Sequence, residues 1–162
     1  PPKTAMGGGM SKAPAQMKDG ERFDPAQIIA FMGKLGHGGM LGIGYHDHGQ
    51  DWVELKLDWR EDLVGDEETQ ILASGPIISL MDMATSLAIW TKLGKFRPHA
   101  TMDLRVDYMR PSPPGQAVIG RGHCYHVTRS IGFVHGTAHN GDPDDPVAHV
   151  TGTFIRTKGF GR

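Results

Sequence analysis

The chain has 162 residues, and its 17 Lys and Arg residues nearly balance its 18 Asp and Glu residues, which gives a formal net charge of −1 at pH 7. That length suits one domain with a sizeable core, and the balanced charge argues against a nucleic-acid-binding surface. The single cysteine, Cys124, excludes an intrachain disulfide and a cysteine-only zinc site. We expect it to be a small core or half-buried residue.

Residues 1–22 mix Pro, Gly, Lys and Met without periodicity, so we expect a disordered or mobile N-terminal arm. The segment lacks the apolar run of a secretory signal, which favours a cytoplasmic location. A single domain is predicted over residues 23–157, and the tail at 158–162 is expected to be frayed.

A short helix is predicted at the start of this domain. Asp24 suits a helix cap and Pro25 the first turn. The residues that would form its apolar face are Ile28, Ile29, Met32 and Leu35. The His-Gly-Gly run at 37–39 precedes a predicted strand, so it is interpreted as a connector.

A hairpin is predicted after this connector, from a strand at 40–45, a turn at 46–51 and a strand at 52–59. Polar and apolar residues alternate in the second strand, which is typical of a half-buried strand. An acidic loop at 61–69 follows.

The stretch at 73–94 predicts one long helix. Ser74 can cap it, Pro76 suits its first turn, and Gly94 suits the residue just past its end. The residues between are apolar almost all round, which is typical of a buried helix. Asp82 near the middle argues against a membrane span.

Asp82 stands out because an ionised carboxylate in an apolar site is costly unless it is paired or hydrogen-bonded. Ser79, Asp82 and Ser86 form one narrow polar stripe on this helix. Two interpretations remain open. Asp82 is either an acid satisfied by its neighbours or a catalytic carboxylate in a cleft, where perturbed acids concentrate.

After the helix the chain is predicted to be all β, with strands at 101–109, 117–127, 131–139 and 147–156. Gly120 and Gly122 are possible bulges, and a dense turn signal occupies 140–146. Lys95 and Arg97, just past the helix, are expected to be surface charges. One long helix wrapped by an antiparallel sheet is an α+β arrangement.

Four features carry a resemblance to a known family. They are the helix acid Asp82, Thr-Met-Asp-Leu-Arg-Val-Asp-Tyr-Met-Arg-Pro at 101–111, Thr-Arg-Ser-Ile-Gly-Phe at 128–133, and Ala-His-Val-Thr-Gly-Thr-Phe at 148–154. In this order the chain resembles hotdog-fold acyl-CoA thioesterases of the 4-hydroxybenzoyl-CoA thioesterase superfamily, most of all the phenylacetate-pathway type. The resemblance implies a hotdog fold and hydrolysis of an acyl-CoA to free acid and CoA. No cofactor is implied, because CoA is part of the substrate.

The resemblance also implies catalytic positions. In such enzymes a His-Gly-Gly signature precedes the helix acid, and here that window reads Ala73-Ser74-Gly75. The N–H of Ser74 would polarise the thioester carbonyl, helped by the helix N-terminus. Asp82 would act as base or nucleophile, and both roles remain open.

Two further positions match the family's site. An Asn or Gln of the family corresponds to Glu67, whose ionised carboxylate cannot donate a hydrogen bond. Thr101 matches a Ser or Thr that helps to hold the attacking water, and its plain alternative is an ordinary strand residue. Because Ser74 lies two turns from Asp82 on one helix, the resemblance implies that two chains share each site, as a homodimer or a dimer of dimers (homotetramer).

Substrate contacts are implied at Arg129, Ser130 and Ile131, where the family touches the CoA arm; the plain alternative for Arg129 is a solvated turn residue. The acyl pocket would be lined by the flank of the helix. That flank contributes Met81, Met83, Ser86 and Leu87. Neither nucleic acid nor a membrane is expected as a partner.

Metal binding is not expected. His46 and His48 lie in a predicted turn and His123 and His126 in one strand, and no third ligand is evident. Two alternatives to a thioesterase remain. One is a hotdog protein that binds acyl-CoA or another acyl ligand without turnover. The other is hydration of an enoyl thioester, against which the absence of an Asp–His pairing on the helix argues.

Overall fold

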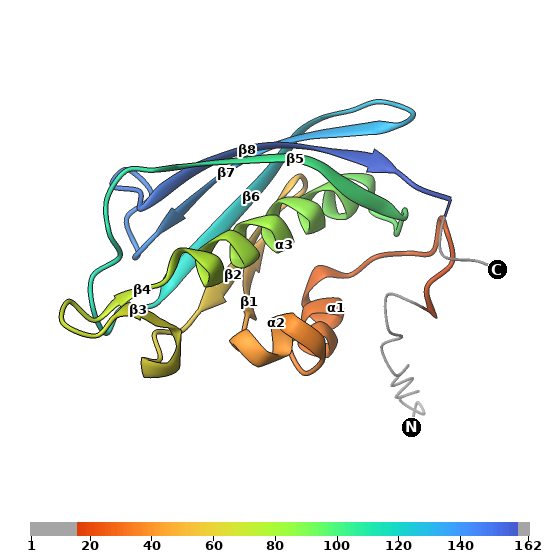
Figure 1. Ribbon diagram of the computed structural model, residues 1–162. Helices are drawn as coiled ribbons and strands as arrows, with labels where there is room; N and C mark the ends of the chain where they lie inside the picture. Colours follow the sequence, from red (N-terminus) through yellow and green to blue (C-terminus); the bar gives the residue numbers. More distant parts are fainter. Residues whose placement is uncertain (1–15, 159–162) are drawn as a thin grey trace, which may run out of the picture.

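The computed structural model describes residues 16–158, in which a six-stranded antiparallel sheet curves around one long helix (Figure 1). The helix is α3 (Ser74–Leu93). The strands, in spatial order, are β1 (Gly44–His48), β2 (Trp52–Leu57), β6 (Val118–Val127), β7 (Ile131–His139), β8 (Ala148–Arg156) and β5 (His99–Tyr108). The predicted α+β hotdog arrangement is confirmed. No helix within this part of the chain is long and apolar enough to cross a membrane.

Helix α3 packs one side against the sheet. Leu80, Met81 and Ala84 are fully buried there, whereas Ile78 on the other side is 40% exposed. Gly94 adopts a left-handed conformation with φ 62° and ends the helix as predicted. Its N-cap is Ala73, which makes no side-chain capping hydrogen bond, so the prediction that Ser74 caps α3 is wrong.

Glycines on β6 bring α3 close to the sheet. A Cβ atom on Gly122 would lie 2.4 Å from the carbonyl oxygen of Ala84, and one on Gly120 would lie 2.8 Å from Cγ of Leu80. Both glycines pair in regular register with β2 and β7, so the predicted bulges are wrong. The irregularity in β6 falls instead between Cys124 and His126.

Cys124 lies in the core on the inner face of β6 and is fully buried, as predicted. Burial raises the pKa of its thiol to about 11. The thiol therefore stays protonated at neutral pH.

Helix α1 (Pro25–Met32) begins as predicted. The Asp24 carboxylate accepts hydrogen bonds from the N–H groups of Ala26 (3.1 Å) and Gln27 (3.4 Å), with Pro25 in the first turn. The helix ends before Leu35, which is 57% exposed, so the predicted role of Leu35 on the apolar face is wrong.

Residues 36–41 form a second helix, α2 (Gly36–Leu41), where a connector and the start of a strand were predicted. Gly42 has φ 72° and ends this helix in a left-handed conformation. Strand β1 therefore begins only at Gly44, and His46 and His48 lie in it instead of in a turn. The following strand, β2, alternates between half-buried and buried residues as predicted.

The predicted acidic loop contains regular structure. A single 3₁₀ turn, η2 (Glu61–Leu63), leads into a hairpin of β3 (Val64–Asp66) and β4 (Ile71–Leu72). The N–H of Ala73 donates to the carbonyl oxygen of Leu63 at 2.9 Å, which ties this hairpin to the start of α3.

Residues 17–22 belong to the folded domain and not to the predicted mobile arm. The N–H of Gly20 donates to Phe96 O (2.9 Å), and the N–H of Phe96 donates to Glu21 O (2.7 Å). Residues 1–15 and 159–162 lie outside the described part of the chain.

Candidate active site

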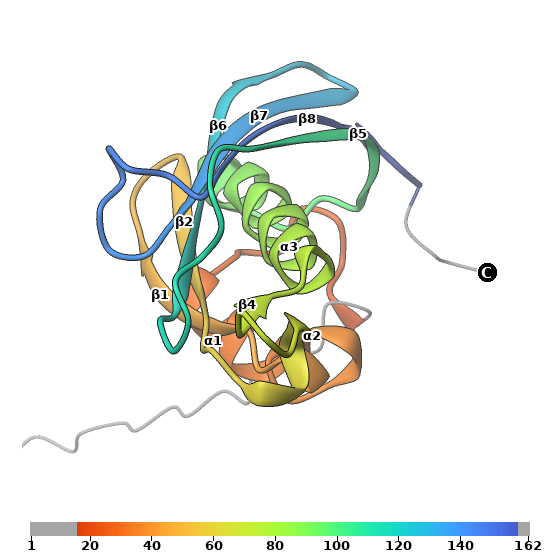
Figure 2. The ribbon, with the colours of Figure 1, turned by 60° about the vertical axis from the view of Figure 1, so that its left-hand side comes forward.

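The side of α3 that faces away from the sheet carries the predicted catalytic residues of this helix, which are Ser74, Gly75 and Asp82. Figure 2 shows α3 with the edge strand β5 on one side and α2 on the other. Ser74, Gly75 and Ile78 are exposed here, and Asp82 is half-buried. The helix acid is therefore open to a ligand instead of being sealed in the core.

Asp82 and Thr101 are brought together. The Thr101 hydroxyl on β5 donates a hydrogen bond to Oδ1 of Asp82, at 2.9 Å. Thr101 lies where the register of β5 against β8 shifts, between Thr101 and Asp103. Because Thr101 donates its hydroxyl proton to Asp82, the Thr101 oxygen can still accept a hydrogen bond from water through its lone pairs. This pair can hold and deprotonate a water molecule.

The start of α3 presents backbone donors. Within residues 16–158, the N–H groups of Ser74 and Gly75 donate to no protein acceptor, as expected for the first turn of a helix. Tyr108 donates its hydroxyl proton to the carbonyl oxygen of Ser74 at 3.2 Å. Burial raises the pKa of Tyr108, which keeps the phenol protonated for this contact.

Ser74 and Asp82 of one chain cannot act on the same carbonyl group. They are separated along the helix axis by roughly 12 Å, at about 1.5 Å per residue. A site that uses both therefore needs Ser74 from one chain and Asp82 from another.

Glu67 is exposed in the turn between β3 and β4. Its carbonyl oxygen accepts a hydrogen bond from the side-chain amide of Gln70 at 2.8 Å. Among the described residues, neither Asp82 nor Ser74 forms a hydrogen bond with Glu67. The structure does not join Glu67 to the other predicted catalytic residues of its own chain.

Ser86 is held by His99, which was not singled out from the sequence. His99 Nδ1 lies 3.1 Å from the carbonyl oxygen of Arg97, so Nδ1 carries the proton. Burial lowers the pKa of His99 to about 4, so the ring is neutral and Nε2 accepts. Ser86 Oγ, 2.7 Å from Nε2, is therefore the donor. The hydroxyl proton of Ser86 is therefore not available to a ligand.

The predicted acyl-pocket residues separate into two groups. Met81 and Leu87 are buried in the core against the sheet, so their predicted place in a pocket wall is wrong. Met83 is half-buried and faces α2, where a Cβ atom on Gly38 would lie 3.5 Å from its sulfur atom.

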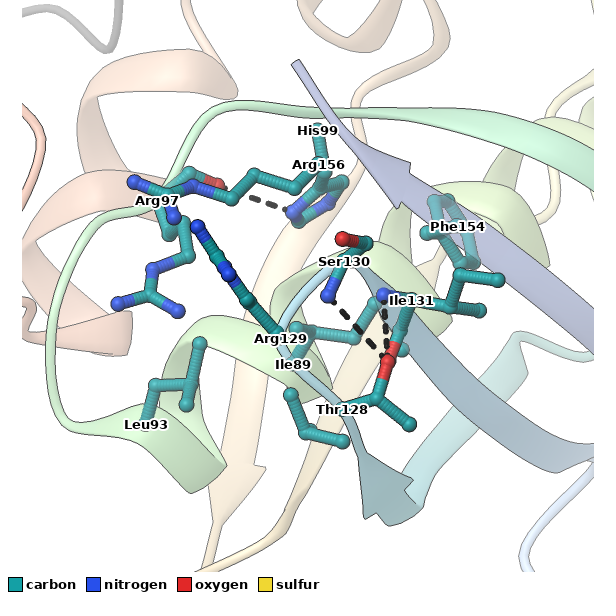
Figure 3. Close-up of a pocket in the computed structure, with 12 residues that line it drawn as sticks. Ile89, Leu93, Arg97, His99, Thr128, Arg129, Ser130, Ile131, Phe154 and Arg156 are labelled. Atoms are coloured by element: carbon teal, nitrogen blue, oxygen red, sulfur yellow. Dashed lines mark hydrogen bonds between the residues drawn. The ribbon is translucent and has the colours of Figure 1, made fainter. Parts of the chain in front are cut away.

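Arg129, Ser130 and Ile131 line one pocket, of about 270 Å³ including its open mouth, near the C-terminal end of α3. The N–H groups of Ser130 (3.3 Å) and Ile131 (2.9 Å) donate to Oγ1 of Thr128, which shapes this turn. Figure 3 shows Arg97, Arg129 and Arg156 gathered on one side of the pocket.

Two of these cations share one acid. Asp19 lies 2.5 Å from Nη2 of Arg156 and 3.8 Å from Nε of Arg97, whereas Arg129 forms no ion pair within the described part of the chain. Arg97 lines the same pocket, so it is not merely a surface charge. Sequence reasoning missed Arg156 and Asp19, because only the fold brings these distant residues together.

The histidines do not form a metal centre in the described range. No cluster of three or more His, Cys, Asp or Glu side chains there could hold a metal ion. His123 Nδ1 lies 2.7 Å from His135 Nε2, and His48 Nδ1 lies 2.7 Å from the Tyr45 hydroxyl.

Comparisons with known proteins identify the family of this chain. Residues 70–147 match the family model described as Thioesterase superfamily. The crystal structure of a Pseudomonas aeruginosa protein is 33% identical, with a TM-score of 0.71 over 80% of this chain and 96% of that one. The chain therefore belongs to the thioesterase superfamily and has its hotdog fold.

More distant structures share the fold. The Haemophilus influenzae thioesterase is 16% identical, with a TM-score of 0.75 over 90% of this chain and 99% of that one. The PaaI protein from the phenylacetic acid degradation operon of E. coli is 18% identical, with a TM-score of 0.69 over 80% of this chain and 90% of that one. No protein with a curated function matches the sequence.

Proposed function

We propose that this protein hydrolyses an acyl-CoA thioester to a free acid and CoA. The observation that carries the proposal is the Asp82–Thr101 pair on the open side of α3, with Thr101 Oγ1 2.9 Å from Asp82 Oδ1. Membership of the thioesterase superfamily supports the same reaction class.

Asp82 acts as general base on a water molecule that also donates to Thr101. The water oxygen adds to the thioester carbonyl carbon while a water proton passes to the Asp82 carboxylate. The N–H of Ser74 stabilises the negative carbonyl oxygen, assisted by the partial positive charge of the helix N-terminus. The carbon–sulfur bond then breaks, and the CoA thiolate takes the proton from Asp82. Direct attack by the Asp82 carboxylate is the other route to the same products.

Each site is composite, with Asp82 and Thr101 from one chain and Ser74 from a second copy. The separation of roughly 12 Å between Ser74 and Asp82 along one helix supports this arrangement. The exposed apolar residues Ile78 and Met102, on α3 and β5, suit burial against a second copy. The assembly is a homodimer, which can pair into a tetramer.

The CoA part of the substrate binds near Arg129. Its phosphates are anions, and guanidinium groups bind phosphate through charge-assisted hydrogen bonds. Arg129 is exposed and forms no ion pair within residues 16–158, and Arg97 and Arg156 lie beside it in the same pocket. The reaction needs no cofactor, and the cytoplasm supplies its substrate.

A non-catalytic acyl-CoA-binding role is the second candidate. The observation that favours it is the Ala73-Ser74-Gly75 window, in which Ala and Ser stand in place of His and the first Gly. A binding protein would keep the pocket and the Arg129 contact without turnover.

A thiol-release assay across a panel of acyl-CoAs separates the two roles. We expect wild type to release CoA and Asp82→Ala to fall to the uncatalysed rate. The matched control is Asp58→Ala, which removes an exposed acid whose ion-pair partner among the described residues is Lys56, at 2.7 Å, and should leave the rate unchanged. If wild type and Asp82→Ala bind acyl-CoA but give the same background rate with every substrate, the binding role is correct.

A further inference from the structure

Helix α2 reaches the first turns of α3 through one side chain. His37 Nε2 lies 3.0 Å from Oγ of Ser79, a contact between residues 42 positions apart. Gly38, the next residue, packs beside Met83 one turn further along α3. The contact therefore places an imidazole on the same open side of α3 as Asp82.

The direction of this hydrogen bond follows from the protons available. Ser79 Oγ donates its only hydrogen to the carbonyl oxygen of Gly75 at 3.0 Å, because a carbonyl can only accept. Ser79 Oγ must then accept from His37, so Nε2 of His37 carries a proton.

The first turn of α3 has little intrinsic stability. Its cap, Ala73, makes no side-chain hydrogen bond. Gly75, its second residue, has the widest backbone freedom of any residue type. Contacts from other elements must therefore fix the direction of the N–H groups of Ser74 and Gly75.

Two tertiary contacts hold the peptide planes on either side of the Gly75 Cα atom. Tyr108 on β5 donates to the carbonyl oxygen of Ser74, which shares a rigid peptide plane with the N–H of Gly75. Ser79 holds the carbonyl oxygen of Gly75, and His37 on α2 holds Ser79. The backbone at Gly75 is thus clamped from β5 and from α2.

We propose that His37 is a positioning residue for the thioesterase reaction, which acts through Ser79 to fix the backbone at Gly75, directly after the Ser74 N–H donor at the tip of α3. The role rests on the proposed function. His37 itself contacts neither the thioester nor the attacking water, and its ring is not an acid or a base in the reaction.

Two substitutions distinguish this role from imidazole chemistry. In His37→Gln the amide nitrogen takes the place of Nε2 and can still donate to Ser79, whereas the shorter side chain of His37→Asn cannot reach it. We expect His37→Asn to lower kcat about tenfold, as misplacement of a catalytic donor does, with a much smaller change in KM. His37→Gln should retain most of the wild-type kcat.

A double-mutant cycle adds an independent readout. Ser79→Ala should lower kcat to a similar degree, and His37→Asn combined with Ser79→Ala should be no slower than Ser79→Ala alone. Thermal unfolding of each variant shows that the loss of kcat is not a loss of fold.

Several results would overturn the proposal. A His37→Asn enzyme with the wild-type kcat removes any positioning role. Equal losses in the Gln and Asn variants point to chemistry by the ring or to general unfolding, and melting temperatures separate these two. If wild-type protein releases no CoA above the Asp82→Ala rate, the proposed function fails and this role fails with it.

Discussion

The hydroxyl of Ser86 donates to Nε2 of His99 at 2.7 Å, and this contact joins α3 to the start of β5 with a neutral imidazole. The pKa of His99 falls to about 4 from the ordinary 6.5 because the ring is buried. Below pH 6.5, His99 takes up a proton in the unfolded chain but stays neutral in the folded chain until the pH approaches 4. The contribution of His99 to the free energy of unfolding is therefore complete above pH 6.5 and is lost as the pH falls towards 4.

We predict that urea unfolding will reveal this linkage. The contribution of His99 amounts to roughly 3 kcal/mol between pH 6.5 and 4, at about 1.4 kcal/mol per pKa unit. Wild type should lose stability over this interval more steeply than His99→Gln. Parallel stability curves for the two proteins would show that His99 ionises normally in the folded state.

The Thr101 hydroxyl is predicted to be needed for catalysis through its contact with Asp82. Thr101→Val keeps the shape and the β-branching but removes the hydrogen bond. Because Thr101 supports the base and is not the base itself, kcat should fall about 10–100-fold, less than the roughly 10²–10⁴-fold that general-base catalysis as a whole contributes. Thr101→Ser keeps the hydroxyl and should lose far less. Steady-state hydrolysis of one acyl-CoA measures both, and equal rates for Val and wild type would assign Thr101 to the sheet alone.

Arg129 is predicted to bind the phosphates of CoA. Arg129→Gln should raise KM for an acyl-CoA about tenfold, since one charged hydrogen bond contributes roughly 1.5 kcal/mol or more. KM for an acyl thioester of N-acetylcysteamine, which lacks phosphates, should not change. Asp19→Asn should act in the opposite direction, because Asp19 partly neutralises Arg97 and Arg156.

Lys56→Gln is the control for Arg129→Gln, since within residues 16–158 Lys56 forms its ion pair with the exposed Asp58, on another part of the surface. The assignment of Arg129 would be contradicted if both variants raised KM equally, or if the phosphate-free substrate were affected as much as acyl-CoA.

Gly122→Ala is predicted to disrupt the packing of α3 on the sheet. Its new methyl group would lie 2.4 Å from a backbone oxygen of Ala84, so helix and strand must move apart. We expect a loss of about 3 kcal/mol or more in the free energy of unfolding, at the upper end for overpacked cores. Gly44→Ala meets no atom within 4 Å and is the control. Equal stability of the two variants in urea would refute the close-packing argument.

The central helix and the main strands could be predicted because each carries a local signal. The capping of Asp24, the left-handed Gly94 and the alternation in β2 are all properties of neighbouring residues. Asp82 was singled out as an acid on an apolar helix and Thr101 through a family resemblance, and in the structure the two side chains form a hydrogen bond.

The errors arose where tertiary contacts override local preference. Gly36 to Gly39 have poor helix propensity, and the contacts of α2 with Ser79 and Met83 on α3 come from a segment distant in the chain. The prediction of bulges at Gly120 and Gly122 is wrong because these glycines instead make room for α3, and the local sequence carries no signal for that packing. Likewise, nothing near Asp19 in the chain predicts its contact with Arg156.

Full burial of the only sulfhydryl group in the chain bears on how the proposed activity can be assayed. Cys124 is inaccessible in the folded state, and its high pKa leaves almost no thiolate at neutral pH. A thiol-reactive dye added to the native protein would therefore report CoA released by the proposed reaction, without interference from the protein. Once the domain unfolds, the same dye labels one site per chain, so a single reagent can follow both turnover and denaturation.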